Sequence, residues 1–182
     1  MKSPVQLLRM IDNLIRLGTV AEVRSGECRV NTGANLSDWR PYIVLRAGRT
    51  RRRMRPSVGE QVLVFSPSGD LRGAIVLAGI NQDAYPEPAA GDDNGDLDRT
   101  EYPDGAVIEY NPKTGALSAT GIKTATLTAS VAVKLITPLV ECSKLLKAQR
   151  ITSETANVGG IEVTTHGHKN VTPGAGQSGG PV

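Results

Sequence analysis

The segment TATLTASVAVKL, residues 124–135, alternates small apolar residues with polar ones. An alternation of period two is typical of β structure, in which successive side chains point to opposite faces. One face of this segment therefore carries Ala, Leu and Val, and the other carries mostly Thr, Ser and Lys. Pro138 interrupts the alternation, and shorter strand-like pieces continue to about Val163. The pattern predicts an extended β element with one apolar face.

The surrounding sequence offers nothing to cover that apolar face. Residues 105–163 contain no convincing helical period and no second block of strands that would complete a sandwich. A lone β element with an uncovered apolar face is unstable in water. Three copies of the chain can turn these faces toward a common axis, which removes sheet edges and requires no aromatic side chains. We therefore expect a homotrimer, and an ordinary monomeric β domain is the alternative.

Residues 19–82 predict a small β-barrel such as an OB-fold, because about five short strand signals fall within them. The clearest is QVLVF, residues 61–65, which follows a turn at Val58-Gly59-Glu60. Aromatic residues are only 3% of the chain, with Trp39 as the single tryptophan, and this shortage favours thin β layers. The other strand signals are residues 19–23, 28–31, 39–45 and 73–80. The fold class expected for the whole chain is all-β.

Pro4 to Leu17 predicts a short amphipathic helix within an N-terminal segment, residues 1–18. Ser3 can cap this helix, Pro4 suits its first turn, and Gly18 ends it. Its apolar face either packs on its own domain or docks onto a partner subunit. Both possibilities stay open on the sequence alone.

Residues 83–104 predict a linker, because prolines and glycines stand there among acidic residues without any periodicity. A hairpin is expected next, from residues 106–110 and 116–120 around the turn Asn111–Gly115. The linker should separate the barrel from the trimeric part, residues 105–163.

The charge is unevenly distributed, although the net charge is only +3. Six arginines lie between Arg46 and Arg55, and a mostly acidic stretch runs from Glu87 to Glu109. The arginines suggest either a nucleic-acid-binding OB-fold protein or a positive rim that meets acidic partner surfaces. Nucleic acid is the less favoured partner, because few aromatic residues are available to stack on bases. No sequence motif of a catalytic site stands out, so we expect no enzymatic activity.

The sequence gives only limited information about the cellular compartment. Cys28 and Cys142 do not make a disulfide framework, and a reducing compartment is the simpler interpretation. Residues 1–17 carry a polar residue every few positions, so no signal peptide is expected. No apolar run approaches the roughly 20 residues that a membrane-spanning helix needs.

His166 and His168 are the only histidines, and they follow the last strand-like segment, residues 161–165. Residues i and i+2 of an extended strand point to the same side, so both imidazoles can face one point. At a threefold axis, three chains would bring six imidazole nitrogens together, which suits an octahedral ion and leaves no open position for catalysis. Imidazole binds iron, nickel and copper alike, so these residues alone do not select the metal. Residues 170–182 read as a terminal tail in isolation.

Several stretches, taken in this order and spacing, resemble the baseplate assembly protein V family, the central spikes of contractile-tail phages and R-type pyocins. The resemblance covers nearly the whole chain. It rests on RMRPSVGEQV (residues 53–62), VLAGI (76–80), YPDGAVIEY (102–110), GIKTA (121–125) and THGH (165–168).

The resemblance implies an N-terminal OB-fold, a triple-stranded β-helix needle woven from three chains over residues 105–163, and an apex at residues 164–182. It implies one iron ion per trimer, held by His166 and His168 of each chain. The expected partners are the tail hub or tube and the baseplate, through the OB-fold end, and the expected target is the outer membrane of a Gram-negative cell. The expected location is the baseplate tip of a virion or bacteriocin tail, after assembly in the bacterial cytoplasm. The lysozyme domain of some larger spikes is not implied, because only the linker stands in its place.

Overall fold

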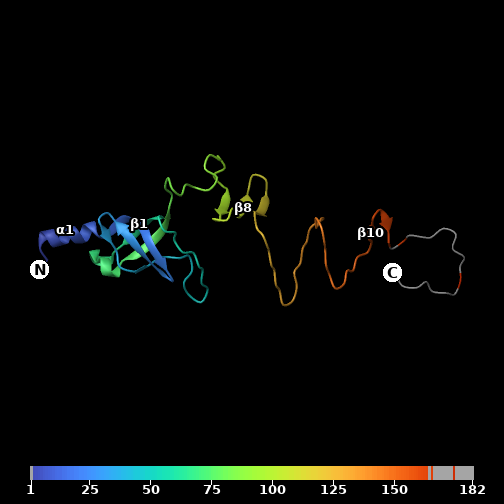
Figure 1. The fold of residues 1–182 in the computed structure, drawn as a ribbon, viewed down its shortest axis with the longest axis horizontal. Helices are drawn as coiled ribbons and strands as arrows, with labels where there is room; N and C mark the ends of the chain where they lie inside the picture. The colour runs from blue at the N-terminus through green and yellow to red at the C-terminus, as the bar shows by residue number, and fades with distance from the viewer. Residues whose placement is uncertain (1, 164, 166–173, 175–182) are drawn as a thin grey trace. The chain divides into compact units, whose positions relative to one another are not determined.

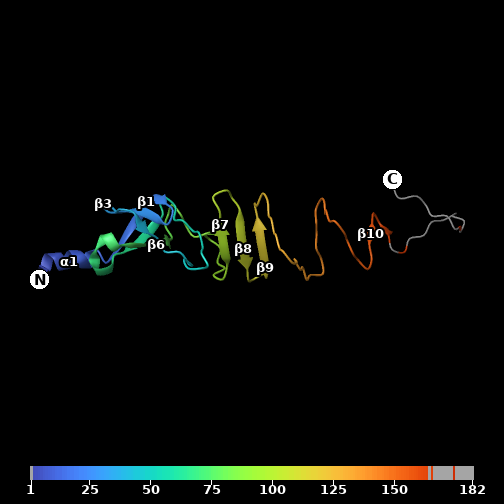
Figure 2. The same ribbon diagram turned by 90° about the horizontal axis from the view of Figure 1, so that it is seen from below.

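The computed structural model describes residues 2–163, 165 and 174, which fall into two compact units, Met1–Thr126 and Leu127–Val182. Figures 1 and 2 show the elements coloured along the chain, from blue at the N-terminal helix to orange-red at residues 157–162. Strands predominate, and one short α-helix stands before them. The prediction of an all-β protein with a short N-terminal helix is confirmed.

Helix α1 spans Pro4–Asp12 and begins with a capping box. The Ser3 hydroxyl accepts a hydrogen bond from the Gln6 amide at 3.3 Å, and the Gln6 side chain accepts one from the Ser3 amide at 3.0 Å. This reciprocal pair satisfies two amides that the first turn leaves without helical partners. None of the helices in the described part of the chain has the length and apolar character needed to cross a membrane.

Six strands of the first unit form one sheet. They are β1 (Ile15–Arg24), β2 (Glu27–Thr32), β3 (Asn35–Leu36), β4 (Arg40–Pro41), β5 (Gln61–Phe65) and β6 (Ile75–Ile80). Strand β1 pairs antiparallel with β2 and with β5, and β5 pairs antiparallel with β6. The short strands β3 and β4 both pair with β2. The predicted strand 61–65 is present, and Ser25 and Gly26 form the turn between β1 and β2.

The sheet closes on itself through the residues that follow β4. Tyr42 forms a parallel bridge to Val76 of β6, and the Ile43 amide donates to the Val76 carbonyl at 2.8 Å. Because β4 pairs with β2, the path β2–β1–β5–β6 returns to β2. Closure gives hydrogen-bond partners to edge groups that would otherwise be free. The result is the small barrel expected of an OB-fold.

The N-terminal helix is shorter than predicted, because Ile15 to Leu17 belong to β1. Ile15 pairs with Phe65 and Leu17 with Leu63, whereas the prediction extended the helix to Leu17 and ended it at Gly18. Apolar residues at positions 15 and 17 also fit the period of a strand, and the ladder to β5 pairs their backbone groups. The first segment therefore ends near Asn13 instead of Gly18.

Two of the predicted barrel strands also differ in length. The strand expected at residues 39–45 is reduced to β4 and the Tyr42 bridge, because Pro41 has no amide to extend a ladder. The strand expected at residues 73–80 begins at Ile75, after a 3₁₀ turn at Leu71–Gly73. Strand β3 has only 2 residues, which are too few to give a strand pattern in the sequence.

The core of the barrel consists of small side chains. Most are valines, which suit the pleated surface of a strand and fill a thin interior without aromatic rings. Burial raises the pKa of the Cys28 thiol to about 11, and the nearby charge of Glu60 adds to this effect. The buried set is Val20, Cys28, Val30, Val62, Val64, Ala74 and Val76.

A second, three-stranded sheet lies within the same unit. It consists of β7 (Asp98–Glu101), β8 (Val107–Asn111) and β9 (Ala116–Thr120), so the predicted hairpin is present. The prediction that residues 83–104 are a linker is corrected by the structure, because the C-terminal part of this stretch forms β7. Its middle part is organised around Asn94, which is buried and donates from its side-chain amide to the Asn111 side chain at 3.2 Å.

The unit Leu127–Val182 contains one small hairpin in its described part. Strand β10 (Asn157–Val158) pairs with β11 (Ile161–Glu162), and Gly159 and Gly160 adopt the positive φ values that such a tight turn requires. Residues 127–156 run back and forth without a strand ladder (Figures 1 and 2). The alternating segment 124–135 therefore has no strand partner among residues 2–163.

Val64 is 1% exposed, and Val64→Ala should destabilise the barrel by about 2 kcal/mol. The variant should label Cys28 roughly 30-fold faster with a thiol reagent at constant pH, because labelling follows the population of opened barrel. Labelling is measured by mass spectrometry of the Cys28 peptide. Val58→Ala is the matched control, because Val58 is 58% exposed. Equal Cys28 labelling in both variants would contradict the packing described above.

Candidate functional site

The sequence-predicted metal ligands, His166 and His168, lie outside the described residues. Within residues 2–163, no three His, Cys, Asp or Glu side chains gather as a metal site would require. The neighbouring Ile161 does lie in a strand, β11, as the sequence predicted for the segment before the histidines.

Residues 127–163 expose apolar side chains that the described part of the chain does not cover. Val131 is 94% exposed, Ile136 is 96% exposed and Leu127 is 76% exposed. Isolated exposed apolar residues are ordinary, but a continuous series of them marks a surface that another molecule covers. The other exposed apolar residues of this series include Val133, Leu135, Leu139, Val140, Leu145, Leu146 and Ile151.

Helix α1 contacts its own domain only near its C-terminal end. Gly69, at φ +67°, lies against the backbone of Met10, where a β carbon would collide. The apolar side chains toward the other end are open, with Val5 75% exposed and Leu8 62% exposed. A helix attached at one end with its apolar face free is suited to dock on a second protein.

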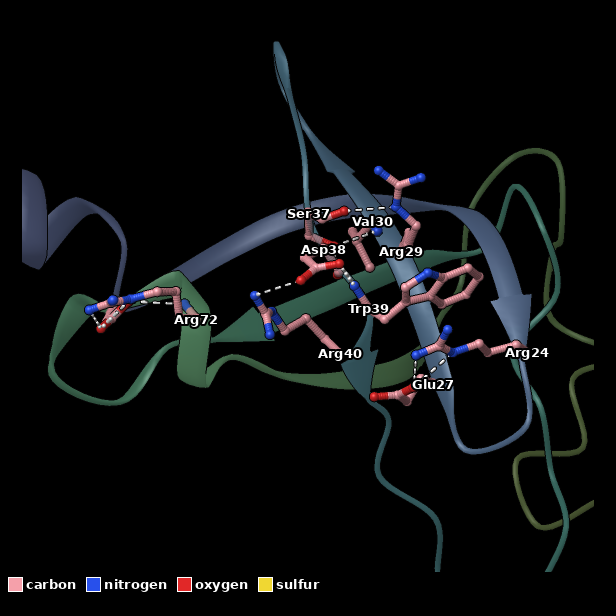
Figure 3. Close-up of polar contacts among 10 residues, drawn as sticks. Arg24, Glu27, Arg29, Val30, Ser37, Asp38, Trp39, Arg40 and Arg72 are labelled. Atoms are coloured by element: carbon pink, nitrogen blue, oxygen red, sulfur yellow. Dashed lines mark hydrogen bonds and ion pairs between the residues drawn. The ribbon is translucent and has the colours of Figure 1, made fainter.

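Trp39 lies on the outer face of the β1–β2 hairpin between two arginines, as Figure 3 shows. The Arg24 guanidinium is 4.2 Å from the centre of the indole ring, and that of Arg29 is 6.0 Å away. Arg24 Nε also donates to a carboxylate oxygen of Glu27 at 2.8 Å. The Trp39 amide donates to the Asp38 side chain at 2.8 Å, which fixes the indole next to β4.

Sequence reasoning noted Trp39 but not this cluster. The signal that could have found it is the short turn at Ser25-Gly26, which places Arg24 opposite Glu27. Arg29 reaches the same face because its Nε donates to the Ser37 carbonyl at 3.0 Å. That contact joins residues separated by a loop, and no local pattern predicts it.

Residues 46–55 form an arm, which we call the arginine arm, between β4 and β5. A bridge from Ala47 to Arg51 and a hydrogen bond from the Arg52 amide to the Arg46 carbonyl at 2.9 Å hold it in a hairpin-like bend. The arm and the β1–β2 turn enclose a hollow of about 550 Å³ lined mainly by arginines and by Tyr42. The arm is the basic surface that the sequence predicted, and it lies on the barrel.

Arg72 and Asp70 form an ion pair with a local structural role. Arg72 donates to the Asp70 carboxylate through its backbone amide and its guanidinium, with a shortest side-chain contact of 2.8 Å. These hydrogen bonds lower the pKa of Asp70 to about 2. The pair shapes the 3₁₀ turn between β5 and β6.

Comparisons with known proteins bear on both units of the chain. A family model described as the OB domain of the type VI secretion system and phage-baseplate injector matches residues 16–80, which correspond to the barrel. The spike protein of Escherichia phage P2 is 43% identical over 156 residues, covering 84% of this chain and 71% of that protein. The similarity to the phage P2 spike protein extends over 156 residues, so it is not confined to the barrel.

Arg24→Ala should uncover the indole of Trp39 and raise its quenching by acrylamide, because the guanidinium no longer covers the ring. The loss of the cation–π contact should cost about 0.5–1 kcal/mol. The single tryptophan makes fluorescence a direct measurement. Arg72→Ala removes another exposed arginine, which lies away from the ring, and should leave quenching unchanged. The same response in both variants would refute the stacked arrangement.

Proposed function

The chain belongs to the phage baseplate spike family, and we propose that it is the central spike of a contractile tail, which pierces the outer membrane when the sheath contracts. In this proposal the protein acts mechanically, without catalysis, as a homotrimer. Residues 105–163 of three chains form a triple-stranded β-helix needle. The barrel carries the needle at the tail end.

The observation that carries the proposal is the uncovered apolar surface of residues 127–163. Covering it within one chain would need a helix or a second sheet, and the described part of this segment contains only the β10–β11 hairpin. Equivalent faces of three copies would cover one another around a common axis. Such an assembly unfolds only as a whole, which gives slow dissociation and the rigidity that a piercing device needs.

The opposite end of the chain is suited to attachment. Val5 and Leu8 on α1 remain exposed, although the capping box and the contact with Gly69 hold the helix in place. We assign to this end the contact with the tail hub or tube and with the baseplate. The assembled protein would then lie at the baseplate tip of a virion or a bacteriocin tail.

The proposed apex contains His166 and His168. Two imidazoles per chain give six per trimer, a donor set that suits an octahedral iron ion, and the family resemblance favours iron over other metals. The ion would join three chain ends where no apolar core is available. It would have a structural role, because a complete shell of six ligands leaves no site for substrate.

Leu127→Asp or Val131→Asp should abolish the trimer, because three charges would meet in an apolar interior. Analytical ultracentrifugation should show a trimer for the unchanged protein and smaller or aggregated species for either variant. Tails assembled with the variant chain should contract without permeabilising the outer membrane, which is measured by uptake of an impermeant dye.

Lys134→Asp is the matched control, since Lys134 belongs to the polar face of the same segment and should tolerate the change. A stable folded monomer of the unchanged protein at micromolar concentration would contradict the proposal. So would tails that still permeabilise cells after the trimer has been lost.

Purified protein should contain about one iron ion per three chains, and changing His166 and His168 together to Ala should remove it. Elemental analysis of protein prepared without chelators measures the metal. Only the neutral imidazole binds, so acid should release the ion around or below the ordinary histidine pKa of about 6.5. The double variant should remain trimeric, because its apolar interior does not depend on the ion. Metal retained by the double variant would refute these ligands.

A further inference from the structure

The arginine arm is a concentrated positive charge without an ion-pair partner in the described part of the chain. It carries six arginines and no carboxylate. All six are exposed, and within the described residues no carboxylate lies within 4.0 Å of any of them. Guanidinium groups form paired hydrogen bonds with carboxylates more readily than other cations do. The arm therefore presents a set of carboxylate-binding groups that its own chain does not use.

Residues 83–98 carry the matching negative charge and are here called the acidic segment. They hold six carboxylates and no Lys or Arg. Local contacts order this segment: the Asn94 amide donates to Asp92 at 2.8 Å, and Lys113 lies 3.3 Å from Asp93. All six carboxylate residues are exposed. The segment is an organised acidic surface whose charge is largely unpaired.

The arm and the acidic segment leave the barrel from one place. The Tyr85 hydroxyl donates to the Val58 carbonyl at 3.1 Å, and the Gln82 side chain donates to the Gly59 carbonyl at 2.8 Å. Val58 and Gly59 follow the end of the arm, and Gln82 and Tyr85 stand at the start of the acidic segment. A rotation about a shared axis keeps equivalent groups at the same level, so each arm would face acidic segments of neighbouring copies.

We propose that the arginine arm of one copy binds the acidic segment of a neighbouring copy, forming three equivalent ionic clamps between the barrel and the needle. The proposal rests on the trimer of the proposed function. Within one chain the middle of the acidic segment is held on the β8–β9 turn through Asn94 and Lys113, and none of its carboxylates forms an ion pair with the arm. Nucleic acid is a poorer occupant, because the acidic segment starts beside the base of the arm and its negative charge would repel phosphates.

The clamp explains why so much charge is placed where the barrel ends. Three arms without partners would repel one another around a common axis, and three acidic segments would do the same. Pairing them across copies replaces both repulsions with attraction. Single exposed ion pairs contribute little, but a network that includes several guanidinium–carboxylate contacts also fixes geometry.

The test uses the full chain with Arg52→Cys and Asp96→Cys, in a background where the exposed Cys142 is changed to Ser. The trimer is first verified by sedimentation, then treated with a short bis-maleimide and separated on a denaturing gel. Pairing between copies should give covalently linked dimers and trimers. Linkage confined to single chains, or no linkage in a verified trimer, would overturn the clamp but not the spike. Absence of the trimer itself would instead count against the proposed function.

The matched control combines Arg52→Cys with Glu154→Cys, which lies outside the acidic segment and should give little linkage. A charge test then separates pairing from mere proximity. Adding Arg51→Glu and Arg53→Glu, or about 1 M salt, should lower the linked yield roughly fivefold or more. Adding Asp83→Lys and Glu87→Lys to the arm variant should restore it. A cross-linked yield that is unchanged by the charge reversals and by salt would overturn the proposal. DNA that binds the arm and prevents the cross-link would overturn it as well.

Discussion

The rest of the structure depends on one constraint: residues 127–163 have an apolar face that the described part of their own chain does not cover. Val131 and Ile136 are almost fully exposed in a single copy, whereas the barrel completely buries core valines such as Val30 and Val62. Hydrophobic burial stabilises the barrel from within the chain. In the proposed trimer the same driving force would act on residues 127–163 between chains, so a self-sufficient domain would be combined with one that assembly completes.

The barrel pairs the backbone groups of strands that would otherwise be sheet edges, although its strands are short. Tyr42 and Val76 join two strands that would otherwise be edges, and the closed sheet then surrounds a core of short side chains. This economy leaves the outer surface free for other uses, such as the Trp39 cluster, the arginine arm and the exposed face of α1. The closed barrel thus carries several exposed groups on its outer surface.

Local patterns predicted the capped start of α1, strand 61–65 and the hairpin around Asn111–Gly115. They were wrong where two periods overlap: residues 15–17 fit a helix and a strand, and only the distant partner β5 decides between them. The linker was misjudged because Asn94 and β7 are held by residues further along the chain. The Trp39 cluster depends on a contact between Arg29 and Ser37 that no spacing rule contains. The proposed histidine site stays a prediction.

The alternating needle segment also imposes an order of events during synthesis. The barrel precedes it in the chain and has its own core, so it can fold while the needle is still being translated. In the proposed trimer the finished segment would wait for two other copies, and its alternating Val- and Leu-bearing sequence would meanwhile be open to cross-β aggregation. Lys134 within this segment and Pro138 just after it are residue types that oppose such stacking. Productive expression of such a trimer would depend on how quickly nascent chains meet, and hence on local chain concentration.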